Sequence, residues 1–213
     1  MDNTPHATID LRTLSAIAAF CSTVNYGFSG VLLEIERHSV TYVATNRTAL
    51  AVRRIEVPDH APKNTLTGQW MLPGKLCRAI KVLKTVRKPS FVPAALTAQS
   101  DGFLTLQHGR GVISGIVPVD HLMWNWRTRT RTTAADCTTG PFHEHFLFSP
   151  ENYSLVCKLG HALGLGNPCL SGTGGRGAAV PFTWIDAPET FCLVEVTRRP
   201  AAPWCAPEWA AGE

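Results

Sequence analysis

The pattern of hydrophobic and polar positions repeats along the chain with a period of roughly 50 residues, which is typical of repeated structural units. In the first copy, hydrophobic residues at helical spacing predict a helix over residues 9–24, and the turn at 25–27 ends it. Three runs rich in aliphatic and β-branched residues follow, and they predict strands at 30–35, 40–44 and 49–57.

Two further copies begin with a short strand and then show the same order. The second copy is predicted to contain a strand at 69–72, a helix at 73–88 and strands at 90–96, 103–108 and 112–117. The third is predicted to contain a strand at 145–148, a helix starting at 149–151 and strands at 178–185 and 191–196. Each copy has one amphipathic helix that can bury a sheet face. The chain is therefore predicted to be an α+β protein built from repeated strand–helix–strands units.

Differences between these segments suggest four parts of the chain. Residues 1–122 hold two units and are predicted to form one domain. Residues 123–142 break the pattern, and we expect a linker or an extended edge segment there. Residues 143–199 hold the third unit, which is a half domain or a divergent one. Residues 200–213 are rich in proline and alanine and are predicted to be an irregular tail.

Five short segments occur in an order and at spacings typical of one protein family. They are 30–34 (GVLLE), 42–52 (YVATNRTALAV), 70–76 (WMLPGKL), 148–153 (FSPENY) and 192–196 (CLVEV). In this order they resemble bacterial DNA polymerase sliding clamps, the β subunit of DNA polymerase III, over roughly residues 8–199. The second segment departs from the clamp motif because Asn-Arg-Thr stands where clamps have Asp-Gly-His, so its turn must form without glycine.

The resemblance implies the DNA clamp fold and a function in DNA replication. It implies a processivity or recruitment factor that encircles or lies along duplex DNA and docks polymerase or other clamp-binding peptides. The alternative is a clamp-like module that binds proteins, or interferes with a clamp, without encircling DNA. A clamp domain holds two units and a bacterial clamp has three domains. A chain of three units is therefore short, and it is expected to form a homo-oligomer.

The helix predicted at 73–88 is strongly basic and contains no acidic residue. Its basic residues are Lys75, Arg78, Lys81, Lys84, Arg87 and Lys88. Like charges repel one another and favour a polyanion nearby, although a solvated helix face is the simpler explanation. The resemblance favours phosphate contacts, because clamp helices line a hole for duplex DNA. Such contacts would not depend on DNA sequence.

A second basic segment contains Arg127, Arg129 and Arg131, which alternate with threonine. In an extended chain these side chains would point to one side. Contact between Arg127 and Arg129 and DNA phosphates is one interpretation, and a solvated basic loop is the other.

The resemblance also implies a partner groove beside the strand–turn–strand segment. Thr45 and Leu50 match the groove threonine and leucine of that motif, and Phe28 takes the place of another apolar groove residue. Leu193 and Val194 correspond to residues of the last strand that line the groove. Packing in the core is the alternative role for the apolar residues.

Composition and cysteine content bear on the class of protein, its location and the presence of catalytic or metal sites. The 213 residues carry a net charge of +4, and 45% of them are hydrophobic, which is ordinary for a globular protein. Only 17% are charged, which is low for a soluble protein and indicates that another subunit covers part of the surface. Seven scattered cysteines without a CxxC pair, and an N-terminus unlike a signal peptide, predict a cytoplasmic protein with reduced thiols. No membrane span is expected. No catalytic motif or standard zinc-ligand spacing occurs, so we expect no enzyme, no metal and no cofactor.

Overall fold

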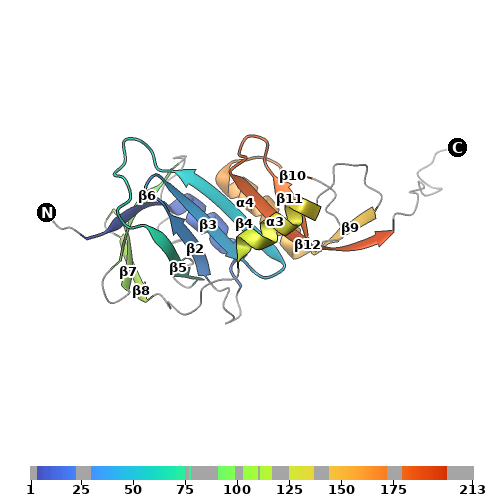
Figure 1. Ribbon diagram of the computed structural model, residues 1–213, viewed down its shortest axis with the longest axis horizontal. Helices are drawn as coiled ribbons and strands as arrows, with labels where there is room; N and C mark the ends of the chain where they lie inside the picture. Colours follow the sequence, from blue (N-terminus) through green and yellow to red (C-terminus); the bar gives the residue numbers. More distant parts are fainter. Residues whose placement is uncertain are drawn as a thin grey trace.

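The computed structural model describes residues 4–22, 30–74, 77, 91–98, 103–109, 111–116, 125–136, 144–171 and 179–200. Two antiparallel sheets form its framework (Figure 1). The smaller sheet has the strand order β1 (His6–Asp10), β6 (Pro93–Ala98), β7 (Phe103–His108) and β8 (Gly111–Ile116). The larger sheet has the order β10 (Cys169–Leu170), β11 (Ala179–Thr183), β12 (Thr190–Pro200), β4 (Ala49–Glu56), β3 (Ser39–Thr45), β2 (Gly30–Ile35) and β5 (Gly68–Pro73).

The first two units exchange their first strands. β1, which precedes the helix of the first unit, pairs with β6 of the second, and β5 of the second unit pairs with β2 of the first. This exchange joins the two units through both sheets. The third unit differs, because its first strand, β9 (Glu144–Phe148), pairs with the C-terminal half of its own β12.

The third unit extends the sheet of the first. The N-terminal half of β12 pairs with β4 over five residues, from Thr190 opposite Arg53 to Val194 opposite Ala49. Glu195 N–H continues this ladder by donating to the Thr48 carbonyl, 2.8 Å away. One sheet therefore runs without a break from the second unit's first strand to β10.

The first helix begins later than the sequence pattern predicts. Residues 9 and 10 belong to β1, and the helix α1 spans Leu11–Ile17, followed by a 3₁₀ turn, η1 (Ala18–Phe20). Asp10 sets the start, because its carboxylate accepts hydrogen bonds from Arg12 N and Thr13 N as a helix N-cap. The expectation of one helix over 9–24 is wrong in this respect.

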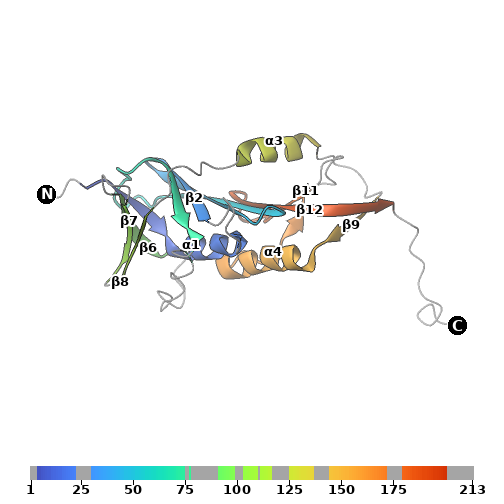
Figure 2. The ribbon, with the colours of Figure 1, turned by 90° about the horizontal axis from the view of Figure 1, so that it is seen from below.

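The main core lies between the larger sheet and the helices α1 and α4 (Pro150–Leu163), which cover the same face (Figure 2). Ile17, Phe20, Tyr42, Leu159 and Trp184 are fully or almost fully buried in it. Gly160 allows α4 to pack closely against the loop that follows it. A Cβ at residue 160 would lie only 2.7 Å from the Gly166 carbonyl oxygen in that loop. No helix among the described residues has the length and apolar character needed to cross a membrane.

A helix also occupies much of the segment expected to be a linker or an extended edge. This helix, α3, spans Trp126–Asp136. Asn125 caps it, since its side-chain oxygen accepts a hydrogen bond from Thr128 N at 3.2 Å. The arginines at 127 and 129 therefore do not alternate along an extended chain, and successive odd positions point to different sides of the helix. The extended interpretation is wrong because contacts with the sheet, described below, favour the helix.

Candidate partner-binding surface

The face of the larger sheet opposite α1 and α4 carries a second, smaller apolar cluster, here called the α3-side cluster. Its buried members come from five strands and are Leu32, Val43, Leu50, Val52, Ala179 and Leu193. The strand register aligns them, since Leu32 lies opposite Val43, Val43 opposite Val52, and Leu50 opposite Leu193. The alternation of side chains along each strand separates this cluster from the main core.

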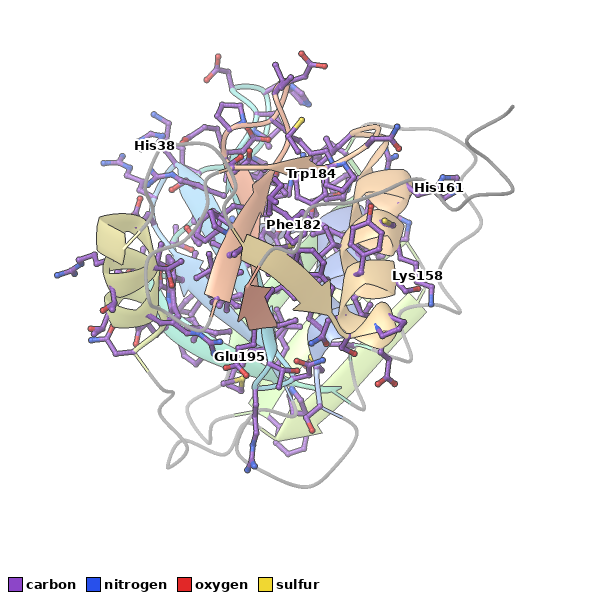
Figure 3. The ribbon with its side chains drawn as sticks, turned by 90° about the vertical axis from the view of Figure 1, so that its right-hand side faces the viewer. His38, Lys158, His161, Phe182, Trp184 and Glu195 are labelled. Carbon is purple, nitrogen blue, oxygen red and sulfur yellow. The ribbon has the colours of Figure 1, made fainter. Side chains whose placement is uncertain are left out.

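Helix α3 lies on this face (Figure 2). Trp126, at its first turn, packs against the α3-side cluster, as do the partly buried Met71 and Phe191. Thr133, seven positions further along α3, is also buried, as expected for two residues on the same face of a helix. Figure 3 shows α3 and α4 on opposite sides of the sheet.

Glu34 on β2 is the first polar contact of α3. Its Oε1 accepts hydrogen bonds from Trp126 Nε1 at 3.2 Å and from Gln69 Nε2 at 3.0 Å, and it forms an ion pair with Arg127. The hydrogen bond to Glu34 raises the pKa of Arg127, whose guanidinium carbon lies 4.4 Å from the centroid of the Trp126 ring. Glu34 is only 8% exposed, and its Oε2 is buried without a hydrogen-bond partner among the described residues.

Glu195 on β12 is the second polar contact. Its Oε1 lies 2.6 Å from Nη2 of Arg129, whose Nη1 donates to the Arg47 carbonyl at 2.8 Å. The same α3 turn thus contacts the first unit through Arg47 and the third through Glu195. Arg131, one helical turn beyond Arg127, is exposed.

The turn between β3 and β4 forms without glycine, as the sequence requires. Arg47 takes the left-handed conformation, with φ of 86°. The Asn46 side-chain oxygen accepts hydrogen bonds from Thr48 N at 3.1 Å and Ala49 N at 2.7 Å. Thr45 Oγ1 accepts from Arg47 N and donates to the Ala49 carbonyl. These side-chain bonds offset the cost of a positive φ at a residue with a Cβ.

The structure brings part of the predicted partner groove together. Leu50 and Leu193 are directly paired and are 0% and 2% exposed, respectively, within the α3-side cluster. Val194 points to the opposite face and is buried in the main core. Thr45 is buried in the turn just described, and Phe28 lies outside the described residues. The proposed groove residues are therefore all inaccessible where they are described, which agrees with the alternative of core packing.

The predicted DNA contacts fall in two places. Lys75, Arg78, Lys81, Lys84, Arg87 and Lys88 all lie outside the described residues. Of the helix predicted at 73–88, Pro73, Gly74 and Cys77 are described. Pro73 ends β5, so the predicted start is wrong by one residue, and Gly74 and Cys77 are helical. Arg127 and Arg129 are on α3, where Glu34 and Glu195 hold them. Their contact with DNA remains a prediction.

Three residues that shape this surface were missed by the sequence reasoning: Glu34, Trp126 and Glu195. Glu34 and Glu195 lie in strands whose other residues are mainly apolar, so nothing nearby in sequence indicates a charged partner. Trp126 had one usable signal. A tryptophan at the start of an otherwise polar run indicates a packing contact, because burial of its large aromatic ring is favourable.

On the opposite face, a polar cleft of about 800 Å³ lies between η1, the β3–β4 turn and α4. Asn152 on α4 joins two of these elements, since it accepts from Asn46 Nδ2 at 3.1 Å and donates to Thr48 Oγ1 at 3.0 Å. Lys158 also lines the cleft, and Figure 3 shows it projecting from α4. No group of three or more potential metal-ligating residues occurs within the described ranges.

Similarity to known proteins appears in structure rather than in sequence. No protein-family model and no curated protein matches the chain. A sliding clamp from Pseudomonas aeruginosa, solved with griselimycin bound, superimposes with a TM-score of 0.59 at 13% identity over 93% of this chain and 68% of that one. The DNA polymerase III β chain of Streptococcus pneumoniae gives 0.58 at 11% identity, over 93% of this chain and 66% of that one. The β subunit of Thermotoga maritima gives 0.58 at 10% identity, over 93% and 67%.

These similarities confirm the predicted fold class. The chain has the fold of bacterial sliding clamps, built from repeated strand–helix–strands units. It spans about two thirds of the length of the clamps it matches.

Proposed function

We propose that the chain is a sliding-clamp-like processivity or recruitment factor. In this proposal it encircles or lies along duplex DNA and docks replication partners, without catalysing a reaction. The observation that carries the proposal is the junction of β4 and β12. It brings the strand–turn–strand segment of the first unit and the last strand of the third into one sheet, with Leu50 beside Leu193. The resemblance in sequence implies that these two segments share one partner site.

Two features support the DNA part of the proposal. The helices α1 and α4 cover one face of the sheet together, and a surface of this kind can lie along a duplex. The chain has a net charge of +4, and six of its basic residues are concentrated within 75–88. Contacts between such residues and phosphates would give affinity that falls with salt and does not depend on base sequence.

A second candidate function is a clamp-like module that binds proteins without encircling DNA. The arrangement of α3 favours it, because the carboxylates of Glu34 and Glu195 already neutralise Arg127 and Arg129. The helix that carries these two arginines, α3, lies on the sheet face opposite α1 and α4. They would therefore not face DNA that lies along the helices.

The two candidates differ in topology on DNA, and this difference can be measured. The full chain would be analysed by light scattering alone, with nicked circular DNA and with the same DNA linearised. A protein that encircles DNA is expected to remain on the circle at high salt and to be lost from the linear form. Equal loss from both forms, in a protein that still binds a hydrophobic clamp-binding peptide, would favour the second candidate. Failure to bind either DNA or peptide would overturn both.

A further inference from the structure

Helix α3 covers the surface to which the proposed function assigns partner docking. Trp126 rests on the cluster that contains Leu50 and Leu193, and Arg127 and Arg129 bind acids at its two sides. A partner that needs these leucines must first move α3 or enter beneath it. The inference that follows concerns the same surface and rests on the proposed function.

The intrinsic tendency of α3 to remain helical is low. It is 11 residues long, and isolated helices of this length are marginal in water. Four of its residues are threonine, whose branched side chain disfavours helix. Thr130 and Thr132 donate to the carbonyls of Trp126 and Thr128, both at 3.0 Å, a bonding pattern that slightly destabilises helices. The tertiary contacts must therefore hold α3 in place.

Among the described residues, the contacts of α3 with the sheet are concentrated in its first half, and Thr133 is buried further along the helix. Trp126, Arg127 and Arg129 all lie in the first turn or just after it, and the Arg127 side chain is 46% exposed. An ion pair with a half-exposed member contributes less than a fully buried one, whereas the Arg129–Glu195 pair is less exposed, at 19% and 39%. A short helix held mainly by Trp126, two ion pairs and the buried Thr133 can be displaced at lower cost than the strands beneath it, which are held by continuous ladders.

The surface beneath α3 has a definite chemical preference. The apolar cluster accepts an aromatic ring, Glu34 accepts an N–H donor and a cation beside that ring, and Glu195 accepts a second cation. Glu34 Oε2 is buried and accepts no hydrogen bond from a described residue, so the carboxylate has unused acceptor capacity. A buried acid with an unused oxygen favours a ligand that brings one more donor than α3 does.

We propose that α3 is a displaceable cover for the partner-binding surface, and that this surface binds a protein segment with an aromatic residue followed by basic residues. The occupant is a peptide of that chemistry from another protein, and α3 is the internal competitor that imitates it. Displacement of α3 is then the step that couples partner binding to exposure of Leu50 and Leu193.

The test uses the full chain with Trp126, Arg127 and Arg129 all changed to alanine, here called the open variant. The probe is a fluorescently labelled peptide with the sequence of residues 125–136. We expect it to bind the open variant at least about tenfold more tightly than the wild type, where α3 occupies the site. Adding Glu34→Gln to the open variant should weaken binding by about fivefold or more, since a charge-assisted bond is lost.

Two matched controls separate this effect from general changes in charge. Full-length Arg131→Ala removes an exposed arginine from the same helix and should leave peptide binding at the wild-type level. A peptide in which glutamate replaces both contact arginines should not bind the open variant. Equal affinity for wild type and open variant, or no binding to an open variant that unfolds cooperatively, would overturn the proposal.

Hydrogen exchange on the wild-type chain tests, without any substitution, whether α3 opens more readily than the sheet. It provides the test if the open variant does not fold. Amides of α3 should exchange at least about tenfold faster than those of β4 and β12, since local opening is cheaper than opening the sheet. Protection of α3 equal to that of these strands would overturn the proposal.

A hydrophobic clamp-binding peptide distinguishes failure of the cover from failure of the proposed function. If it binds wild type and open variant equally well, the surface binds partners but α3 does not compete. If it binds neither, while the 125–136 peptide binds the open variant, the cover stands and the clamp-type partner site does not.

Discussion

Leu50 on β4 and Leu193 on β12 lie directly opposite each other, although they belong to the first and third repeats. The pair joins two units that are distant in sequence into one sheet. It also places both leucines on the face that α3 covers, in the same cluster as Val43 and Val52. A substitution at either leucine therefore affects the junction between the units as well as the surface.

Leu50→Lys is expected to destabilise the protein rather than only to block a groove. Leu50 is 0% exposed, and a lysine there would bury a charge without a designed partner. The milder Leu50→Ala is expected to lower the free energy of unfolding by about 2–5 kcal/mol, through lost burial and the remaining cavity. Urea unfolding followed by circular dichroism measures this change.

The matched control is Val112→Ala, because Val112 is 56% exposed on β8. Its free energy of unfolding should stay within about 0.5 kcal/mol of the wild type, as is usual for surface substitutions. A Leu50→Ala protein as stable as this control would mean that Leu50 is not packed as the structure places it.

The strands were largely predictable because their burial leaves a strong pattern. The predicted strands at 30–35 and 103–108 coincide with β2 and β7, and the strand at 49–57 differs from β4 by one residue. In β2 and β3 every residue is buried. β2 is apolar except for Glu34, and β3 is rich in aliphatic and β-branched residues, so both runs are easy to recognise.

The elements that were missed depend on contacts that are distant in sequence. β1 is short, and it is a strand because β6 pairs with it and Asp10 ends it by capping α1. α3 has a polar, threonine-rich sequence, and its helix depends on Trp126, Glu34 and Glu195. Similarly, Leu50 and Leu193 could be linked to one site by family resemblance. Nothing local in the sequence indicated that a helix covers both.

Gly160→Ala should displace α4 from the third unit's strands. The added Cβ would lie 2.7 Å from the Gly166 carbonyl oxygen and 2.8 Å from Trp184 Nε1, and both are held in place. Overpacking of this kind costs about 1–3 kcal/mol, which exceeds the gain in helix propensity from glycine to alanine. Thermal unfolding and tryptophan fluorescence would report the loss of stability and the movement of Trp184.

Ser154→Ala, on the same helix, is the comparison for Gly160→Ala. Ser154 is half-buried and alanine favours helix, so its unfolding temperature should match or slightly exceed that of the wild type. If both variants behaved alike, the close approach of α4 to Trp184 would be unsupported.

The third unit predicts self-association. In the first two units each first strand pairs with the other unit's sheet, whereas β9 pairs within its own unit and β10 ends the larger sheet with two residues. A clamp domain holds two units, so the third unit is expected to find its second unit in another chain. We expect a homo-oligomer: four chains of three units would supply the twelve units of a clamp ring, and three chains would suffice if each chain formed two complete domains. Light scattering at micromolar concentration gives the mass, and the mass of a single chain would contradict the expectation.

The basic segment at 75–88 carries the prediction that bears most directly on function. If Lys75, Arg78, Lys81 and Lys84 contact phosphates, each contact releases counterions, so duplex affinity should fall steeply with salt. Changing all four to alanine should flatten the slope of log affinity against log salt by roughly two to four units. Fluorescence anisotropy with two unrelated duplexes would measure this slope. Both duplexes should respond equally, because phosphate contacts do not distinguish base sequence.

The control for that experiment removes positive charge elsewhere. Lys63→Ala changes an exposed lysine in the loop between β4 and β5, and it should alter the slope by much less than the fourfold variant. If the fourfold variant kept the wild-type slope while remaining folded, the basic segment would be a solvated surface. The sheet junction at Leu50 and Leu193 and the cover formed by α3 would not be affected by that result. The protein would then be explained better as a partner-binding module that does not encircle DNA.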